Sequence, residues 1–338
     1  MPGLVDLAVA ATVLAAPMAG GPSTPDLVTA TAAAGSLGFL AGGYRTAAQL
    51  AAQIAEVRAI TPTFAVNLFA PNPIPVDPEA YAQYAARLAE RADHFGVVVP
   101  PRPIDDDDGW PDKLDLLIED PVPLVSFTFG LPPAGAIRAL HRAGSAVAQT
   151  VTGPAEARWA QDAGVDLLIV QSVDAGGHSA VFDPSVQPPA QALPDLVRQI
   201  AGATRRPLIA AGGLSSADQV ASAVRAGAAA VLVGTALLLA DEAGTSAVHR
   251  AAIVGRPGPT VITRAFTGRP ARGLANEFVA QFGPGAPLGY PALHHLTSPL
   301  RKAAAAAGDP EWVHLWAGTG HRRVTPGPVA DILRRLAV

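Results

Sequence analysis

The stretch RPLIAAGGLSSADQVASAVRAGAAAVLVGT, residues 206–235, holds a short apolar run, a helical segment and a second apolar run. The runs 206–213 and 229–235 are nearly continuous in apolar residues, which is typical of parallel strands covered on both faces. The segment 215–227 begins with serine and ends with glycine, the usual signals for the start and the end of a helix. The stretch therefore predicts one strand–helix–strand unit of an α/β protein.

The same unit repeats along the chain from its beginning to about residue 240. Helical segments such as 24–35 and 46–59 separate the apolar runs. Eight strands, each followed by a helix, predict a (β/α)8 TIM barrel. An open doubly wound sheet would usually carry a GxGxxG turn after its first strand, and MAGGPSTP (18–25) does not supply one. The six runs that precede the opening stretch are 13–20, 37–43, 63–69, 122–130, 146–151 and 166–172.

Two segments depart from this rhythm. Residues 266–300 are rich in Gly and Pro, which predicts a small helical insertion after the eighth strand, over 241–310, that is either a lid or a plain surface insertion. The barrel would then comprise 1–240 and 311–338 and end in a helix over 326–338. The long connection between the third and fourth strands contains FGVVVPP (95–101) and the acidic DDDDGW (105–110). We predict a solvated loop for the acidic run, with a metal site as the alternative.

Composition narrows the class of protein. The 338 residues carry a net charge of −4, and the 24 Lys and Arg residues are scattered, so no basic stripe for nucleic acid is expected. Cysteine is absent, which excludes disulfides, thiolate ligands and a cysteine nucleophile. The N-terminal segment 1–21 is apolar but lacks a basic region and contains Asp6, unlike a signal peptide. We expect a cytoplasmic protein that does not bind membranes, either a monomer or a homodimer.

Glycines follow the seventh and eighth predicted strands. A barrel binds ligands at the carboxyl ends of its strands and commonly holds phosphate after strands 7 and 8. AAGG (210–213) and VGT (233–235) end these two runs and expose backbone N–H groups, and Thr235 adds a hydroxyl. The helix that opens at Ser215 and Ser216 would direct its positive end to the same place. We predict a phosphate cradle, although glycines could also simply end the two strands.

The loop after the sixth strand, SVDAGGHSA (172–180), places two glycines beside a histidine. Gly176 and Gly177 would let the backbone approach a ligand, and His178 would stand beside it. A plain turn is the alternative for the glycines, and a structural role is the alternative for the histidine. Gln171 and Asn67 stand at the tips of the sixth and third strands, where each amide would either contact the ligand or cap a loop.

The chain resembles the nitronate monooxygenases, formerly called 2-nitropropane dioxygenases. The resemblance covers nearly the whole chain and is weakest over 95–115. The matching blocks, in chain order, are APMAGGPSTPDLVTATAAAGSLGFLAGG (16–43), FAVNLFAP (64–71), VQSVDAGGHSA (170–180), PLIAAGGLSSADQVASAVRAGAAAVLVGTALL (207–238), RPARGLANEF (269–278) and LWAGTG (315–320).

The resemblance implies an FMN bound without a covalent link. It also assigns roles to single residues. His178 would stand near the reactive nitrogen of the flavin, either as the base for a neutral nitroalkane or as the group that holds the nitro oxygens of a nitronate. Met18 would lie against the flavin ring. The residues that would contact FMN or its phosphate are Asn67, Gln171, Gly176, Gly213, Leu232, Val233, Gly234 and Thr235, with Gly177 beside them.

Several positions depart from the family pattern. Ser172 replaces a usual glycine, Asp174 a usual glutamate and Val233 a usual methionine. Ser179 and Ala180 replace a frequent pair of a basic residue and glycine. Asp174 keeps the charge but shortens its reach. These departures bear on the substrate more than on FMN.

The reaction that the resemblance implies is oxidation of alkyl nitronates or nitroalkanes by O₂ to a carbonyl compound and nitrite. The nearest alternative is an FMN-dependent reductase that takes electrons from NAD(P)H and passes them to quinones or enoyl thioesters. A non-catalytic flavin-binding protein and a barrel enzyme that binds phosphosugars are also compatible with parts of the sequence.

Overall fold

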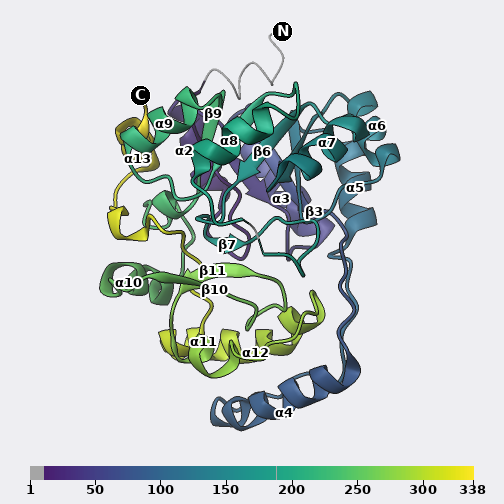
Figure 1. Ribbon diagram of the computed structural model, residues 1–338, viewed down its shortest axis with the longest axis vertical. Coiled ribbons are helices and arrows are strands. Elements are labelled where there is room, and N and C mark those ends of the chain that lie inside the picture. Colours follow the sequence, from purple (N-terminus) through teal and green to yellow (C-terminus); the bar gives the residue numbers. More distant parts are fainter. Residues whose placement is uncertain (1–10, 188) are drawn as a thin grey trace.

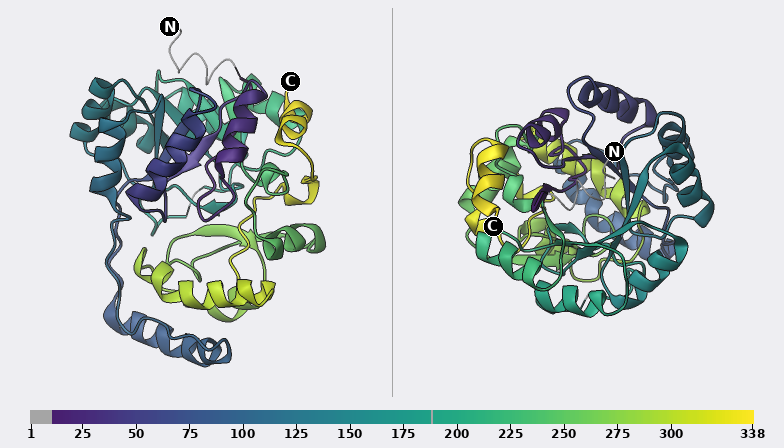
Figure 2. Two further views of the ribbon diagram at one scale, coloured as in Figure 1. Left: turned by 180° about the vertical axis from the view of Figure 1, so that it is seen from behind. Right: turned by 90° about the horizontal axis from the view of Figure 1, so that it is seen from above.

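The chain folds into a barrel of eight parallel strands, seen end-on in the right-hand view of Figure 2. The computed structural model describes residues 11–187 and 189–338, so the first ten residues, where the signal-peptide comparison begins, lie outside it. The strands neighbour one another in the order β1-β9-β8-β6-β5-β4-β3-β2, and a bridge between Ala15 and Gly38 joins the two ends. The predicted TIM barrel is confirmed. Its strands are β1 (Val13–Ala15), β2 (Phe39–Ala41), β3 (Ala65–Phe69), β4 (Leu124–Thr128), β5 (Ala146–Val151), β6 (Leu167–Gln171), β8 (Leu208–Ala211) and β9 (Ala230–Val233).

Helices surround the barrel, and those expected from the sequence form where their capping residues predict. Thr24 accepts a hydrogen bond from the N–H of Leu27, Ser216 accepts one from Gln219, and Thr46 forms a capping box with Gln49. The predicted closing helix is α13, which packs on α2, α9 and β1. The outer helices are α2 (Pro25–Ala33), α3 (Ala47–Arg58), α5 (Trp110–Glu119), α6 (Ala134–Ala143), α7 (Pro154–Ala163), α8 (Leu193–Ala201), α9 (Ala217–Arg225) and α13 (Val329–Leu336).

Two apolar layers hold the barrel together. Small and medium side chains such as Leu14, Ala65 and Ala230 fill its interior, where they are fully buried. A larger cluster lies between the strands and the helices. Strands buried on both faces need apolar residues at every position, which is why their sequences read as continuous apolar runs.

The insertion after the eighth strand is not purely helical, contrary to our expectation. Strands β10 (Thr260–Thr263) and β11 (Ala271–Leu274) pair antiparallel, and β11 pairs in turn with β7 (Gly177–His178), which comes from the loop after β6. This small sheet lies across the carboxyl ends of the barrel strands (Figure 1) and ties the insertion to the predicted site. The remaining elements of this region are η1 (Thr235–Leu237), α10 (Ala247–Gly255), α11 (Glu277–Phe282), α12 (Ala292–Ala306), η2 (Pro310–Trp312) and η3 (His321–Arg323).

The insertion shares its hydrophobic core with helix α4 (Pro78–His94), which belongs to the connection after β3. In Figure 1 this helix lies beyond the insertion, far from the strand it follows. Tyr84 is buried there, and its hydroxyl donates to the carbonyl of Ala265 at 2.7 Å. Trp312 and Leu315 pack into the same core although they lie beyond residue 310. The predicted domain boundaries at residues 240 and 310 therefore leave out parts of the core of the insertion. One of these parts, helix α4, lies far from the insertion in the sequence.

The acidic run 105–108 is only partly a solvated loop. Asp108 forms an ion pair of 2.8 Å with the buried Lys113 and accepts a hydrogen bond from the N–H of Tyr44. Asp106 pairs with His295 of α12 at 2.8 Å, which links the connection to the insertion. Among residues 11–187 and 189–338, no group of three His, Cys, Asp or Glu side chains is arranged to hold a metal ion. The two inward carboxylates instead fasten neighbouring segments.

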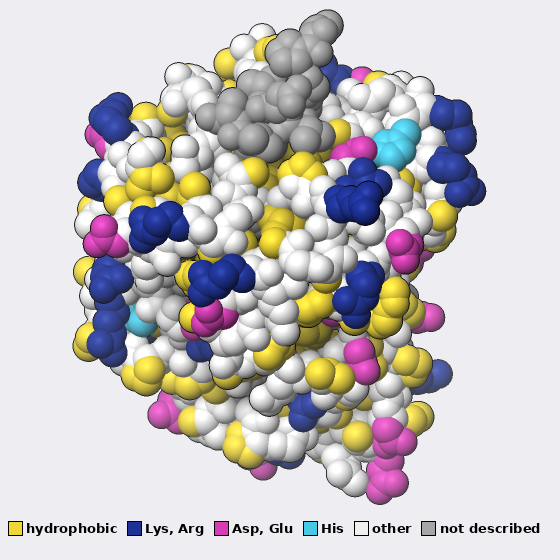
Figure 3. Space-filling view, turned by 45° about the horizontal axis from the view of Figure 1, so that its top comes forward, with side chains coloured by type: hydrophobic (Ala, Val, Ile, Leu, Met, Phe, Trp, Pro, Cys, Tyr) yellow, Lys and Arg dark blue, Asp and Glu magenta, His cyan; other side chains and the backbone are white. Residues whose placement is uncertain are grey.

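The outer surface agrees with the scattered charge of the sequence. On the face drawn in Figure 3, Lys and Arg side chains lie among acidic and uncharged groups. None of the helices in the described part of the chain is both long enough and apolar enough to cross a membrane.

Candidate active site

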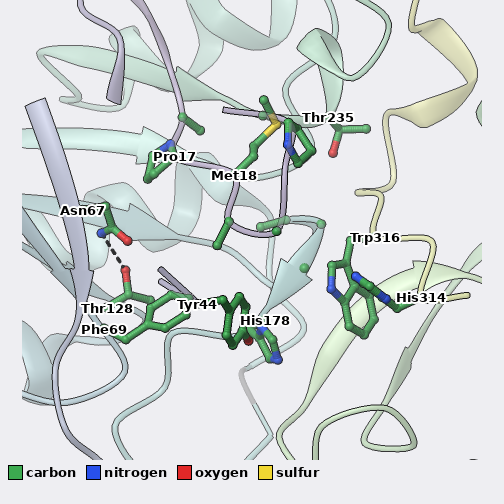
Figure 4. Close-up of a pocket in the computed structure, with 18 of the residues that line it drawn as sticks. Pro17, Met18, Tyr44, Asn67, Phe69, Thr128, His178, Thr235, His314 and Trp316 are labelled. Carbon is green, nitrogen blue, oxygen red and sulfur yellow. Dashed lines mark hydrogen bonds between the residues drawn. The ribbon is translucent and has the colours of Figure 1, made fainter. Parts of the chain in front are cut away.

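A cavity of about 860 Å³ opens at the carboxyl ends of the barrel strands, between the barrel and the insertion. Figure 4 shows part of its wall. Every residue that the sequence analysis placed in the site lines this one cavity, although the residues come from separate strands and loops. They are Met18, Asn67, Gln171, Gly176, Gly177, His178, Gly213, Leu232, Val233, Gly234 and Thr235.

The predicted phosphate cradle consists of backbone amides that lack partners. The N–H groups of Gly213, Gly234 and Thr235 donate no hydrogen bond to any residue that the structure describes. The start of α9 is less open than expected, since Gln219 accepts hydrogen bonds from the N–H and the hydroxyl of Ser215. Unpaired amides in a buried wall need an acceptor, so this wall suits a phosphate group.

The segment 315–320 packs against the predicted cradle, although none of its residues was predicted to belong to the site. The N–H of Gly318 donates to the hydroxyl of Thr235 at 2.9 Å, and the N–H of Thr319 donates to the carbonyl of Asp174 at 3.1 Å. Gly320 also lines the cavity, where a β-carbon on it would lie 2.7 Å from Ser215. The two glycines of LWAGTG were the signal for this role, because they allow one backbone to run closely over another.

Position 176 requires glycine for a reason that the sequence did not reveal. A β-carbon on Gly176 would lie 2.5 Å from the nitrogen of Gly318, too close for any side chain. The chain itself therefore requires this glycine, whatever ligand the cavity takes. Gly177 has a φ of +76°, with open space around the position of its β-carbon. Here the glycine serves the backbone turn into β7.

The side-chain amides of Gln171 and Asn67 differ in how many of their polar atoms form hydrogen bonds within the protein. Gln171 donates to the carbonyl of His178 at 3.2 Å and accepts from the N–H of Ala180 at 2.8 Å, so it braces the histidine loop. Asn67 donates from Nδ2 to Ser126 and to the hydroxyl of Thr128, the bond dashed in Figure 4. Its Oδ1 accepts no hydrogen bond from the described residues and is left for a ligand.

His178 lies in a box of aromatic rings. Phe129 and Tyr290 meet it edge-on, and the Trp316 ring centre lies 5.6 Å away. Its Nε2 is 2.9 Å from the hydroxyl of Thr267, which fixes the orientation of the ring. Burial, together with the positive charges of Arg269 and Arg301, lowers the pKa of His178 to about 3. The imidazole of the free protein is therefore neutral at pH 7.

Arg269 holds the loop that follows His178. It is fully buried, donates from Nε to the carbonyl of Ser179 at 3.2 Å, and donates from a terminal nitrogen to the carbonyl of Val181. No carboxylate among the described residues pairs with it. Burial lowers its pKa to about 10, which still leaves it protonated at neutral pH.

The wall opposite the strand tips comes from α12 and from the loop after β2, and the sequence analysis did not find it. Tyr44 stacks on His294 with the ring centres 4.2 Å apart. Arg301 lies seven residues further along the same helix and also lines the cavity. Two histidines and an arginine were visible in HHLTSPLR (294–301), within the predicted insertion, but nothing in the sequence showed that this segment faces the barrel.

Comparisons with known proteins point to one family. The model of the nitronate monooxygenase family matches residues 2–338. A nitronate monooxygenase of Pseudomonas aeruginosa is 36% identical over 336 residues, covering 96% of this chain and 94% of that protein. A probable nitronate monooxygenase of Staphylococcus saprophyticus is 35% identical over 311 residues, covering 90% and 87%.

Among solved structures, nitroalkane oxidase from Streptomyces ansochromogenes superposes with a TM-score of 0.92 at 42% identity, covering 98% of this chain and 96% of that one. FabK from Thermotoga maritima is less similar, with a TM-score of 0.75 and 25% identity over 98% and 93% of the two chains. The family model spans almost the entire sequence, and both curated relatives exceed 30% identity over most of their length. The chain therefore belongs to the nitronate monooxygenase family.

Proposed function

We propose that this protein is an FMN-dependent oxidoreductase that oxidises alkyl nitronates with O₂ to a carbonyl compound and nitrite. The observation that carries the proposal is one cavity in which backbone amides without partners among the described residues face the same space as a neutral histidine. The family and the likeness to a nitroalkane oxidase support this chemistry.

The residues present fit FMN. Gly213, Gly234 and Thr235 would hold the phosphate through their N–H groups, and the free Oδ1 of Asn67 would accept from the ring system. Met18 lies beside Gly234 and supplies an apolar surface for the ring. When bound, FMN supplies the redox chemistry, taking electrons from the substrate and passing them to O₂.

His178 favours a nitronate over a neutral nitroalkane as the substrate. A base with a pKa of about 3 is poorly suited to remove a proton from carbon. A neutral imidazole is well suited to donate a hydrogen bond to an anion, and Arg269 and Arg301 add positive potential around it. A bound anion would in turn raise the pKa of His178, because opposite charges favour the protonated form. The chain's own groups therefore receive a substrate that has already lost its proton.

Aromatic rings shield His178 from water on three sides. Phe129 and Tyr290 are buried beside it, and Trp316 closes a third side. Strand β11 pairs with β7 directly at His178 and so holds the insertion against the site. Such shielding from water strengthens the hydrogen bonds that hold an anion. We propose on this basis that residues 241–310 act as a lid.

Anaerobic mixing tests the proposal directly. Protein loaded with FMN is mixed with propionate 3-nitronate and, separately, with NADH, while the visible absorbance of the flavin is followed. We expect the nitronate to bleach the flavin and nitrite to appear when O₂ is admitted. Bleaching by NADH alone would favour the reductase, and a yellow protein that neither donor bleaches would be a non-catalytic flavin-binding protein. A protein that takes up no FMN would refute the cofactor.

We also propose where the enzyme is located and how it assembles. We place it in the cytoplasm, which fits the lack of cysteine in its sequence, and we expect a monomer or homodimer. Size-exclusion chromatography with light scattering would measure the oligomeric state, and a larger assembly would contradict this expectation.

A further inference from the structure

Arg301 is the centre of a second polar cluster in the cavity wall. The side chain is 5% exposed, and its Nε donates to the hydroxyl of Thr297 at 3.0 Å. One terminal nitrogen donates to Nδ1 of His314 at 3.0 Å. The other donates to the carbonyl of His294 at 3.0 Å and lies 3.3 Å from Nδ1 of the same residue. One N–H of the guanidinium, on the nitrogen that faces His314, has no acceptor among the residues that the structure describes.

The charge of this cluster has no partner. Burial lowers the pKa of Arg301 only to about 10, so the guanidinium is positive at neutral pH. Within residues 11–187 and 189–338, no carboxylate forms an ion pair with it. The two acidic side chains of the cavity wall nearest to α12, Asp106 and Asp108, are paired with His295 and Lys113. A buried cation without a counter-charge is unfavourable unless a ligand supplies one.

The two histidines add donors and no charge. Arginine has no acceptor, so Nδ1 of His294 and of His314 must be unprotonated, and Nε2 of each neutral ring carries the hydrogen. Burial first, and then the charge of Arg301, lowers the pKa of both rings well below the usual value. Neither Nε2 has a hydrogen-bond partner among the described residues, and both side chains line the cavity. The cluster thus offers donors and a fixed positive charge.

This cluster is separate from His178. The indole of Trp316 lies between them, 5.6 Å from the ring of His178 and 5.4 Å from that of His314, centre to centre. Figure 4 shows His314 beside Trp316, on the side away from Asn67. His178 comes from the loop after β6, whereas Arg301 and His294 come from α12. Two binding points therefore stand on different elements of one cavity.

We propose that Arg301, His294 and His314 form a binding site for a small planar oxyanion. The remaining N–H of Arg301 and the Nε2–H groups of the two histidines can donate to the oxygens of such a group, and the buried positive charge favours an anion. The inference rests on the proposed function for its ligands, since that reaction supplies planar oxyanions in two forms: the nitronate group of the substrate and the nitrite product. Either form fits the same set of donors.

The test measures nitrite binding to the FMN-loaded protein by calorimetry at constant ionic strength, with sodium chloride as the reference anion. Arg301→Met should weaken nitrite binding at least about tenfold, because it removes the charge-assisted donors. The matched control is Lys302→Met, which removes the same charge from the next residue of α12. Lys302 also lines the cavity but is exposed to water, so its loss should change binding by less than about twofold.

A second measurement separates the two sources of the anion. The KM for ethyl nitronate is determined for the same variants. If it rises together with the nitrite dissociation constant, the site holds the nitronate group, and if only nitrite binding weakens, the site holds the product. Both results support an oxyanion site. Should Arg301→Met not fold, as judged by its flavin content and Tm, His314→Phe keeps a flat ring, removes one donor and should weaken nitrite about threefold.

Nitrite that binds wild type no better than chloride, or binds Arg301→Met as tightly as wild type, would overturn the inference. Equal binding to wild type and His314→Phe would do the same where only that variant folds. Nitrite binding does not depend on nitronate turnover. A protein that binds nitrite through Arg301 but oxidises no nitronate would refute the proposed function alone.

Discussion

Arg269 lies over the ring of Phe129, with the guanidinium carbon 4.1 Å from the ring centre, and Phe129 in turn meets His178 edge-on. Phe129 has a φ of +84°, a conformation that residues other than glycine rarely adopt. The arginine therefore covers a strained residue at the end of β4 while it holds the carbonyls that follow His178. This contact connects the stability of the fold with the position of the proposed active-site histidine.

Replacing Arg269 by Met should destabilise the protein by about 3 kcal/mol, because it leaves the buried carbonyls of Ser179 and Val181 without a charged donor. Urea unfolding measures the effect. Arg269→Lys keeps the charge and should lose less stability. If Arg269→Met unfolds at the wild-type urea concentration, the clamp contributes nothing.

Below about pH 6.5 the buried neutral state of His178 should make the protein less stable. Its folded pKa of about 3 lies below the unfolded value of 6.5, so the unfolded chain binds the extra proton first and stability falls as pH falls. Wild type should therefore lose about 2 kcal/mol more than His178→Gln between pH 7 and pH 5. Urea titrations at the two pH values test this, with the exposed His94→Gln as the control. Identical losses in wild type and His178→Gln would contradict the assignment.

A side chain at Gly176 should disturb both the fold and the cofactor. Gly176→Val places carbon against the backbone of Gly318, so we expect a loss of at least about 2 kcal/mol and weaker retention of FMN. Gly135→Ala is the control, because nothing lies within 4 Å of its β-carbon position and it stands in a helix. The ratio of flavin to protein absorbance and the Tm are measured. Unchanged flavin content in Gly176→Val would refute the placement of this loop.

The hydroxyl of Thr235 joins the tip of β9 to the segment 315–320 through its bond to Gly318. Thr235→Val keeps the shape and removes the acceptor, and should weaken FMN binding about tenfold, whereas Thr235→Ser should stay close to wild type. Fluorescence titration of the apoprotein with FMN gives both dissociation constants. Equal affinity in the valine and serine variants would show that this bond does not shape the cradle.

The barrel could be predicted from the sequence because the signals for its strands and helices are local. Continuous apolar runs, capping residues such as Thr24 and Ser216, and glycines at strand ends each act over a few residues. Because parallel strands in a barrel bring their carboxyl ends together, the order of the runs was enough to gather Asn67, Gln171 and Thr235 around one cavity.

The opposite wall of the cavity could not be predicted from the sequence. Helix α4 has an apolar face that any core could accept, and only packing assigned it to the insertion. The pairing of β11 with β7, the close approach of Gly318 to Gly176 and the facing of Arg301 into the cavity join segments many residues apart. The sequence by itself determined which strands form the barrel and which residues end them. Only the tertiary structure decided the burial that keeps His178 neutral and leaves Arg301 without a counter-charge in the described part of the chain, because desolvation depends on the whole surrounding fold.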